Sequence, residues 1–301
     1  MRISDNMIAA SLIVRLQKAS ARLFRLQEKV ASGLAFSLPS QDPPAAMRAA
    51  ALRSGVSELS RYRANCDVAA ARLHLTESAL ANIADSLREA YSAALGMTPF
   101  DEAGNNALAD RIHQIAASIA AEANAASEGR YLFSGHQTLT QPLTPNPDGV
   151  PPYAYQGDRG DIVVQLGRDV PLVTNIDAAE VLNMDGEIDP DRDDALETLR
   201  KAEAVLRSGD MDALANVLSA IQWHVDRTVA LRGQVGARLQ HVDLAKQRLE
   251  DGVRTLQSLL SETQDTDITR VLIDLKAQEV AYQAAAAAAS ALHRASLLEY
   301  L

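Results

Sequence analysis

The sequence has few aromatic residues, a single cysteine and no long apolar run. Phe, Trp and Tyr make up 4% of the 301 residues, although hydrophobic residues in total make up 47%. Because bulky side chains are needed to fill a wide globular core, this composition suits thin helical bundles better. Cys66 is the only cysteine, which excludes an internal disulfide and a cysteine metal cluster.

Basic charge is also in deficit. The chain has 29 Lys and Arg residues against 39 Asp and Glu residues, a formal net charge of -10. This balance argues against a nucleic-acid groove or an anionic membrane as the main partner. No stretch reaches the ~18 apolar residues of a membrane span, and the N-terminal apolar patch lacks the cleavage site of a signal peptide. We therefore expect a cytoplasmic protein, or one exported with its signal uncleaved.

The common catalytic and ligand-binding patterns are missing as well. The six histidines are scattered, with no pair at i, i+4 that would hold a metal. Ser134 and His136 are neighbours in sequence, but they lie outside a G-x-S-x-G nucleophile elbow. No glycine-rich phosphate loop is present. We expect no enzymatic activity, no metal and no cofactor.

Apolar residues at alternating steps of three and four, the 3.5-residue spacing of a coiled-coil seam, are abundant at both ends of the chain. The N-terminal seam consists of Ala9, Leu12, Leu16, Ala19, Leu23, Leu26 and Val30. The C-terminal seam consists of Ile268, Val271, Leu275, Tyr282, Ala285, Ala289 and Leu292, with Gln278 as its polar exception. Each seam is a narrow stripe on its helix.

Such an end is at the limit of what could fold alone. Burying six seam side chains and forming the helical hydrogen bonds only about offsets the backbone entropy of ordering ~30 residues. We therefore expect the ends to be disordered or frayed in the monomer and to become helical when a neighbouring copy completes the seam. This behaviour is typical of a polymerising protein.

Between the ends, the pattern predicts a helical bundle interrupted by a β-rich segment. Gly33 should end the first helix. Asp42 is a good N-cap for a long helix that starts at Pro43, and an apolar seam runs along this helix from Leu59 to Ala94.

We expect a turn from Pro99 through Asn106 and a third helix from Leu108. Helix should resume by Ala195, and a second long apolar seam should run from Leu214. Five of the 11 prolines lie between residues 142 and 152, which excludes helix there, and short apolar runs at 154–156, 162–166 and 170–174 predict strands.

The fold class that we predict is mainly α: a long antiparallel helical bundle or coiled coil, built from the N- and C-terminal halves, with a small β-rich insert. Residues 1–38 with 262–301 would form a terminal coiled-coil region. Residues 39–129 with 195–261 would form the bundle domain, and residues 130–194 the insert.

Several short motifs carry a resemblance to a known family. The start Met1-Arg2-Ile3-Ser4, the turn Leu38 to Pro43 and the close Ser296 to Leu301 resemble the shared ends of the bacterial flagellin superfamily. The segments Glu128 to Gly135 and Tyr155 to Asp158 resemble the hook-filament junction type, hook-associated protein type 3, more than filament flagellin. The family-motif residues are Ser40, Asp42, Pro43, Tyr131, Leu132, Phe133, Gly135, Gly157, Asp158, Ser296, Leu297 and Leu298.

The resemblance implies a structural subunit of the bacterial flagellum that forms the junction between hook and filament. It implies export in an unfolded state through the flagellar type III system, without a cleaved signal, and an extracellular location. The implied partners are further copies in a ring, a neighbouring hook-associated protein, flagellin and a cytoplasmic export chaperone. Two alternatives stay open: a filament-forming flagellin, and a non-flagellar helical binding module.

Overall fold

The structure is a computed structural model that describes residues 5–99, 101–146, 149–184 and 189–298; at residues 5, 6, 8, 9 and 291–298 it describes the backbone alone. The chain forms two compact units, one of residues 1–58 and 251–301 and one of residues 59–250. The helices α2 (Pro43–Leu95) and α6 (Met211–Gln264) contribute residues to both units. The finer division expected from the sequence, at residues 38, 129, 194 and 261, stays a prediction.

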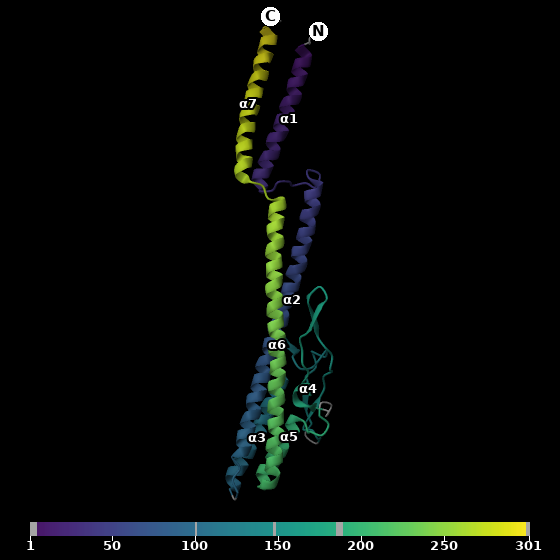
Figure 1. Cartoon of the computed structure of the whole chain (residues 1–301), viewed down its shortest axis with the longest axis vertical. Coiled ribbons are helices and arrows are strands. Elements are labelled where there is room, and N and C mark those ends of the chain that lie inside the picture. The colour runs from purple at the N-terminus through teal and green to yellow at the C-terminus, as the bar shows by residue number, and fades with distance from the viewer. Residues whose placement is uncertain (1–4, 100, 147–148, 185–188, 299–301) are drawn as a thin grey trace. The chain divides into compact units, whose positions relative to one another are not determined.

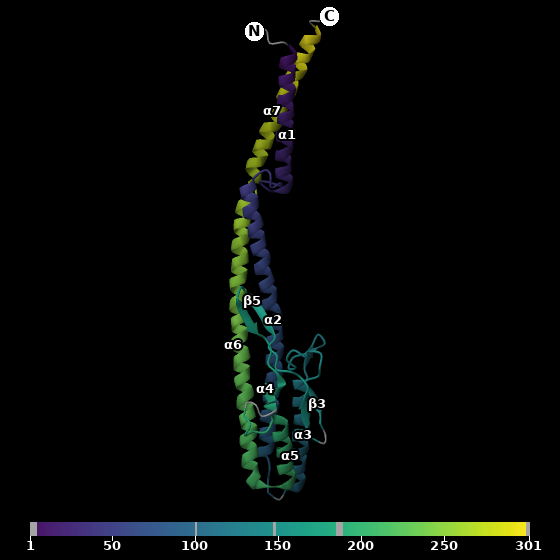
Figure 2. The same cartoon turned by 90° about the vertical axis from the view of Figure 1, so that its right-hand side faces the viewer.

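In the first unit, α1 (Asp5–Ser32) and α7 (Ile268–Leu298) lie side by side in opposite directions (Figures 1 and 2). Gly33 ends α1 as the sequence predicts: it adopts a φ of 73°, and its N–H donates to the Lys29 carbonyl at 2.9 Å. Asp267 starts α7 by accepting a 3.1 Å hydrogen bond from the Arg270 N–H.

The chain leaves α1 and enters α7 at one short backbone clamp, formed by residues 33–35 and 264–266. Leu34 and Asp265 form an isolated antiparallel bridge. The Ala35 N–H donates to the Gln264 carbonyl at 2.7 Å, and the Thr266 N–H donates to the Gly33 carbonyl at 2.9 Å. Two segments 231 residues apart in sequence are thus joined through their main chains.

The start of α2 confirms the predicted cap. The carboxylate of Asp42 accepts a 3.1 Å hydrogen bond from the Ala45 N–H, and Pro43 occupies the first helical position. Gly55 brings α2 close to α6, since a Cβ at this position would lie 3.0 Å from the Leu256 side chain. This close approach pairs the two long helices within the first unit.

The second unit is a helical bundle in which α3 (Glu102–Ala123) and α5 (Ala195–Ser208) join α2 and α6 (Figure 2). The predicted α2 seam is its core, and Cys66, Leu73, Leu80 and Ile83 are fully buried. Burial raises the pKa of the Cys66 thiol. Ile221 and Val235 of α6 are likewise inaccessible to solvent.

The expected turn through Asn106 was wrong, because α3 begins earlier, at Glu102. The carboxylate of Asp101 accepts a 3.0 Å hydrogen bond from the Gly104 N–H and so caps the helix. The side chain of Asn105 pairs with the backbone N–H and carbonyl of Thr98, at 3.1 and 2.9 Å. Residues typical of turns thus stabilise a helix start here.

Among the residues that the structure describes, the insert and the segment just before it contain three two-stranded antiparallel sheets. The pairs are β1 (Ala126–Ser127) with β2 (Arg130–Tyr131), β3 (Leu143–Pro145) with β4 (Tyr153–Tyr155), and β5 (Val163–Gly167) with β6 (Val170–Val173). A short helix that the sequence pattern did not predict, α4 (Ala178–Leu182), follows them between an Asp177 cap and the left-handed Asn183. A β-rich insert is confirmed, with helix at its C-terminal side.

Two buried titratable groups lie where α5 packs against α6. Asp194 caps α5 by accepting from the Glu197 N–H at 2.9 Å, and burial raises the pKa of its carboxyl to about 6. His224 lies 3.3 Å from the Thr198 hydroxyl, and burial lowers the pKa of its imidazole to about 4. Trp223, the only tryptophan, stacks edge-on against the His224 ring.

These shifts predict opposite pH dependences. Between pH 7 and pH 4 the unfolded chain gains the His224 proton first, which lowers stability, whereas the folded chain gains the Asp194 proton first, which raises it. From pH 7 to pH 4, the unfolding free energy of Asp194→Asn should fall by about 2 kcal/mol more than that of the wild type, and the unfolding free energy of His224→Gln should fall by about 3 kcal/mol less. Urea unfolding followed by Trp223 fluorescence measures both, and parallel curves for the two variants would contradict the assignment.

Candidate assembly surface

The N-terminal seam predicted from the sequence faces inward on α1. Leu12, Leu16, Leu23, Leu26 and Val30 are half-buried, while the residues between them are mostly exposed. The seam therefore matches the 3.5-residue spacing, and one partner helix covers it only in part. The expectation that the ends fray in the monomer stays a prediction.

The C-terminal seam is covered less evenly. On α7, Val271 is buried, and Leu275, Ala285 and Ala289 are half-buried. Ile268 and Tyr282 keep 49% and 36% of their surface exposed. The side chain of Leu292 lies outside the described residues.

Gln278, the polar exception in the seam, has a specific partner. Its Nε2 donates to the Ala19 carbonyl of α1 at 3.3 Å. A polar side chain in an apolar seam favours the one register in which it can make its hydrogen bond. This contact therefore favours one alignment of α1 against α7.

A second apolar stripe on α7 was missed by the sequence reasoning. Ile273, Ala277, Val280, Ala284 and Ala287 recur at the same steps of four and three, two residues out of phase with the seam. All five are exposed, Ile273 to 66% and Val280 to 64%. We call this set the outer stripe of α7; the alternating spacing was a sufficient signal to find it.

An uncharged groove runs beside the seam between α1 and α7. It encloses about 560 Å³ and is lined by Leu16, Gln17, Ser20, Ala21, Phe24, Tyr282 and Ala286. Phe24 is 72% exposed although it is aromatic. No lining side chain carries a charge, so this α1–α7 groove is suited to an apolar or small-residue surface.

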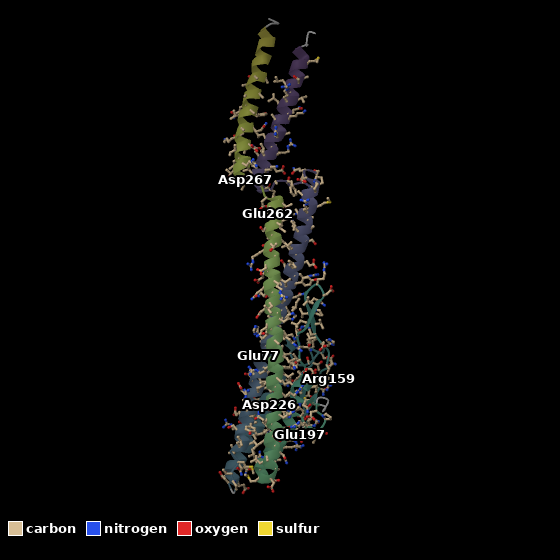
Figure 3. All side chains as sticks on the ribbon, viewed as in Figure 1. Glu77, Arg159, Glu197, Asp226, Glu262 and Asp267 are labelled. Carbon is tan, nitrogen blue, oxygen red and sulfur yellow. The ribbon has the colours of Figure 1, made fainter. Side chains whose placement is uncertain are left out.

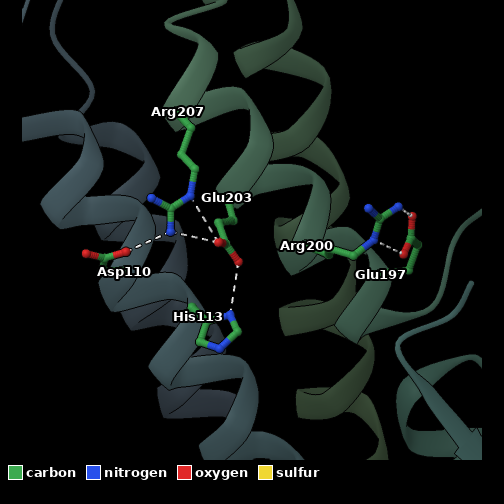
Figure 4. Close-up of polar contacts among 6 residues, drawn as sticks. All are labelled: Asp110, His113, Glu197, Arg200, Glu203 and Arg207. Atoms are coloured by element: carbon green, nitrogen blue, oxygen red, sulfur yellow. Dashed lines mark hydrogen bonds and ion pairs between the residues drawn. The ribbon is translucent and has the colours of Figure 1, made fainter. Parts of the chain in front are cut away.

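Basic residues form a separate stripe on α1. Arg15, Lys18, Arg22, Arg25 and Lys29 follow each other at steps of three and four, and the structure shows no ion pair for them among the residues it describes. In the second unit, by contrast, Arg207 bonds Asp110 at 2.7 Å and Glu203 at 2.9 Å, and His113 also contacts Glu203 (Figure 4). Acidic residues of the first unit gather near the start of α7, where Glu262 and Asp267 lie (Figure 3).

The family motif of the insert is one hydrogen-bonded turn. Gly135 adopts a φ of 64° against Asp158, whose Oδ1 accepts from the N–H groups of His136 at 2.6 Å and Gly160 at 3.0 Å. The hydrogen bond from the His136 N–H and, to a smaller extent, the one from the Gly160 N–H lower the pKa of the Asp158 carboxyl. The hydroxyl of Tyr155 donates to the carbonyls of Asp158 at 2.7 Å and Phe133 at 3.2 Å.

Around this turn the motif side chains serve packing. Phe133 is fully buried and Leu132 nearly so, while Tyr131 is half-buried. Gly157 lies against Tyr155 and the Ser134 Cα, with no room for a side chain. The structure thus brings the residues of the two insert motifs together.

The motif residues outside the insert are not brought together in the same way. Asp42 and Pro43 start α2, and Ser40 is exposed in the preceding turn. Gln41 accepts a 2.9 Å hydrogen bond from the Ser37 N–H with its side-chain oxygen, as a carboxylate at this position could. The side chains of Ser296, Leu297 and Leu298 lie outside the described residues.

The serine and histidine of the insert do not face each other as a nucleophile and base would. The Ser134 hydroxyl is buried, and Nε2 of His136 contacts the Asp161 carbonyl at 3.0 Å. Among the described residues, no three His, Cys, Asp or Glu side chains are grouped to hold a metal ion. None of the described helices is long and apolar enough to span a membrane.

Comparison with known proteins shows which proteins the chain resembles. The bacterial flagellin N-terminal helical region matches residues 3–138. Flagellar hook-associated protein 3 of Salmonella typhimurium is 21% identical over 304 residues, which cover 94% of each chain. The chain is similar to the bacterial flagellin family along residues 3–138, and to this hook-associated protein along most of its length.

Solved structures show the same fold. A flagellar hook-associated protein of Vibrio parahaemolyticus has a TM-score of 0.67 at 20% identity, covering 75% of this chain and all of that one. FlgL of Bacillus cereus has a TM-score of 0.58 at 22% identity, with 70% and 99% covered. The flagellar junction protein FlgL of Legionella pneumophila has a TM-score of 0.61 at 14% identity, with 72% and 99% covered.

Two glycines of the insert allow a matched test of the motif turn. A Cβ at Gly135 would collide with the Asp158 backbone, whereas a Cβ at Gly129, which also has a positive φ, would meet nothing within 4 Å. Gly129→Ala should cost about 1 kcal/mol, and Gly135→Ala about 3 or more. Thermal unfolding and limited proteolysis of the insert measure the difference; equal effects would show that the turn is not tightly packed.

Proposed function

We propose that this protein forms the junction between hook and filament of the bacterial flagellum. The observation that carries the proposal is the similarity to hook-associated protein 3 along 94% of both chains, which is too long to be confined to the terminal helices. Filament flagellin shares the terminal helices, so the insert discriminates between the two. The turn formed by Gly135, Tyr155 and Asp158 is the local feature that supports the junction type.

In this role the terminal helices α1 and α7 would meet those of neighbouring copies in a ring. Apart from the buried Val271, the described seam side chains on these helices keep part of their surface exposed, and Ile13, Phe24, Ile273 and Val280 are more than half exposed. An apolar surface of this kind gains free energy when a neighbour covers it. A neighbouring hook-associated protein and flagellin would adjoin the ring along the flagellar axis.

Before assembly the same surface would need another cover. An export chaperone in the cytoplasm, bound to α7, would prevent premature association, and the type III system would then export the chain unfolded to the extracellular flagellum. The single buried cysteine is compatible with this route, because no disulfide has to be broken for unfolding.

Deletion of the gene and immunolabelling test the junction role together. The deletion should leave hooks without filaments, and antibody against the insert should label one narrow zone at the base of each wild-type filament. Labelling along the whole filament, or long filaments grown from purified protein on seeds, would favour a filament flagellin. Motile deletion cells with no labelling would favour a non-flagellar binding module.

Truncation separates assembly from folding. Removal of residues 1–30 or 268–301 should abolish incorporation into flagella, because each removes one wall of the α1–α7 seam. The second unit has its own core, so its melting temperature should change by only about 4 °C or less. Calorimetry of the truncated and complete chains checks this, and a large loss of stability would show that the ends fold onto the bundle.

A further inference from the structure

The pair of terminal helices presents two uncharged surfaces on different faces. The outer stripe of α7 projects Ile273 and Val280 between small alanines. The α1–α7 groove is hollow and is walled by Phe24. None of the outer-stripe residues lines the groove, so the two surfaces are separate.

We propose that the outer stripe of α7 of one copy seats in the α1–α7 groove of the next copy. The proposal rests on the proposed assembly function and names the surfaces through which it takes place. Since a copy offers its stripe to one neighbour and its groove to another, the contact is heterologous and continues around a ring or along a helix.

The dimensions of the two surfaces agree. Ile273 and Val280 are seven residues apart, which places them about 10 Å apart along the helix. Gln17 and Phe24 on the groove wall have the same separation, with Ser20 and Ala21 between them. The two large side chains of the stripe can therefore enter spaces repeated at the same interval, as knobs enter holes in a coiled coil.

The chemistry favours a second copy over a charged partner. A basic or acidic helix in the groove would bury its charges without a counterion, because no groove residue is charged. The outer stripe of α7 is uncharged along its whole described length. Tyr282 belongs both to the seam and to the groove lining, so a docked helix would extend the existing α1–α7 apolar layer.

Disulfide trapping in flagella tests the contact. The chain would carry Cys66→Ala, Val280→Cys and Ser20→Cys, so that one new thiol lies on the stripe and the other in the groove. Mild oxidation of isolated flagella should give a ladder of covalent multimers on a non-reducing gel, because each copy bonds two neighbours. The matched control replaces Ser20→Cys by Arg22→Cys, two residues away and outside the groove; it should give at least ten-fold less multimer.

A second pair of variants guards against a failure of the cysteine chain to assemble. Val280→Asp should lower incorporation into flagella at least ten-fold, whereas Ala281→Asp, exposed on α7 but outside the stripe and groove, should leave it near the wild-type level. Equal effects of the two aspartates would overturn the proposal. So would a ladder with Arg22→Cys, a cross-link to a different flagellar protein, or flagella that contain the cysteine chain without multimers. Absence of the wild-type protein from flagella would instead refute the proposed function.

Discussion

The structure depends on narrow apolar stripes spaced 3.5 residues apart, each of which can be covered by one neighbouring helix. A stripe of this width buries one face of a helix and leaves the others available. In the second unit, α3 and α5 join α2 and α6, and core residues such as Leu80 and Ile83 lose all contact with solvent. In the terminal pair α1 and α7 pack against each other, and most of the seam side chains that the structure describes stay half-buried.

This difference explains how one type of sequence pattern gives both a stable bundle and an assembly surface. On the surface of the bundle, Arg207 forms ion pairs with Asp110 of α3 and Glu203 of α5 and so links these two helices. The terminal pair keeps apolar side chains on its outside, with Phe24 and Ile273 about as exposed as surface charges usually are. A chain that makes its own core at one place and an incomplete layer at another can fold first and associate afterwards.

The helices and the insert could be predicted from sequence because their signals are local. Spacing located α1, α2, α6 and α7, and the caps Asp42 and Gly33 fixed two of their ends. The start of α3 could not be predicted from the sequence, because asparagine is typical of turns. Asn105 lies in a helix here, where its side chain is held by hydrogen bonds with the backbone of Thr98. The short α4 has too few residues to show a period.

The candidate site was predictable to a similar degree. The seams on α1 and α7 follow from the 3.5-residue rule, and a second reading of α7 in another phase would have found Ile273 and Val280. The groove could not be predicted, since its shape depends on how far Phe24 and Tyr282 project from two separate helices. The motif turn needed long-range contacts as well, because Asp158 meets His136 across 22 residues.

The backbone clamp between residues 33–35 and 264–266 has a mechanical consequence. A part of a protein that is connected by one chain segment can rotate freely about its single bonds. Here two chain segments run side by side and are joined by the Leu34–Asp265 bridge. Twisting the chain on one side of the clamp against the other side must strain both segments and break the hydrogen bonds between them. A joint built in this way can transmit torque although it is only a few residues long.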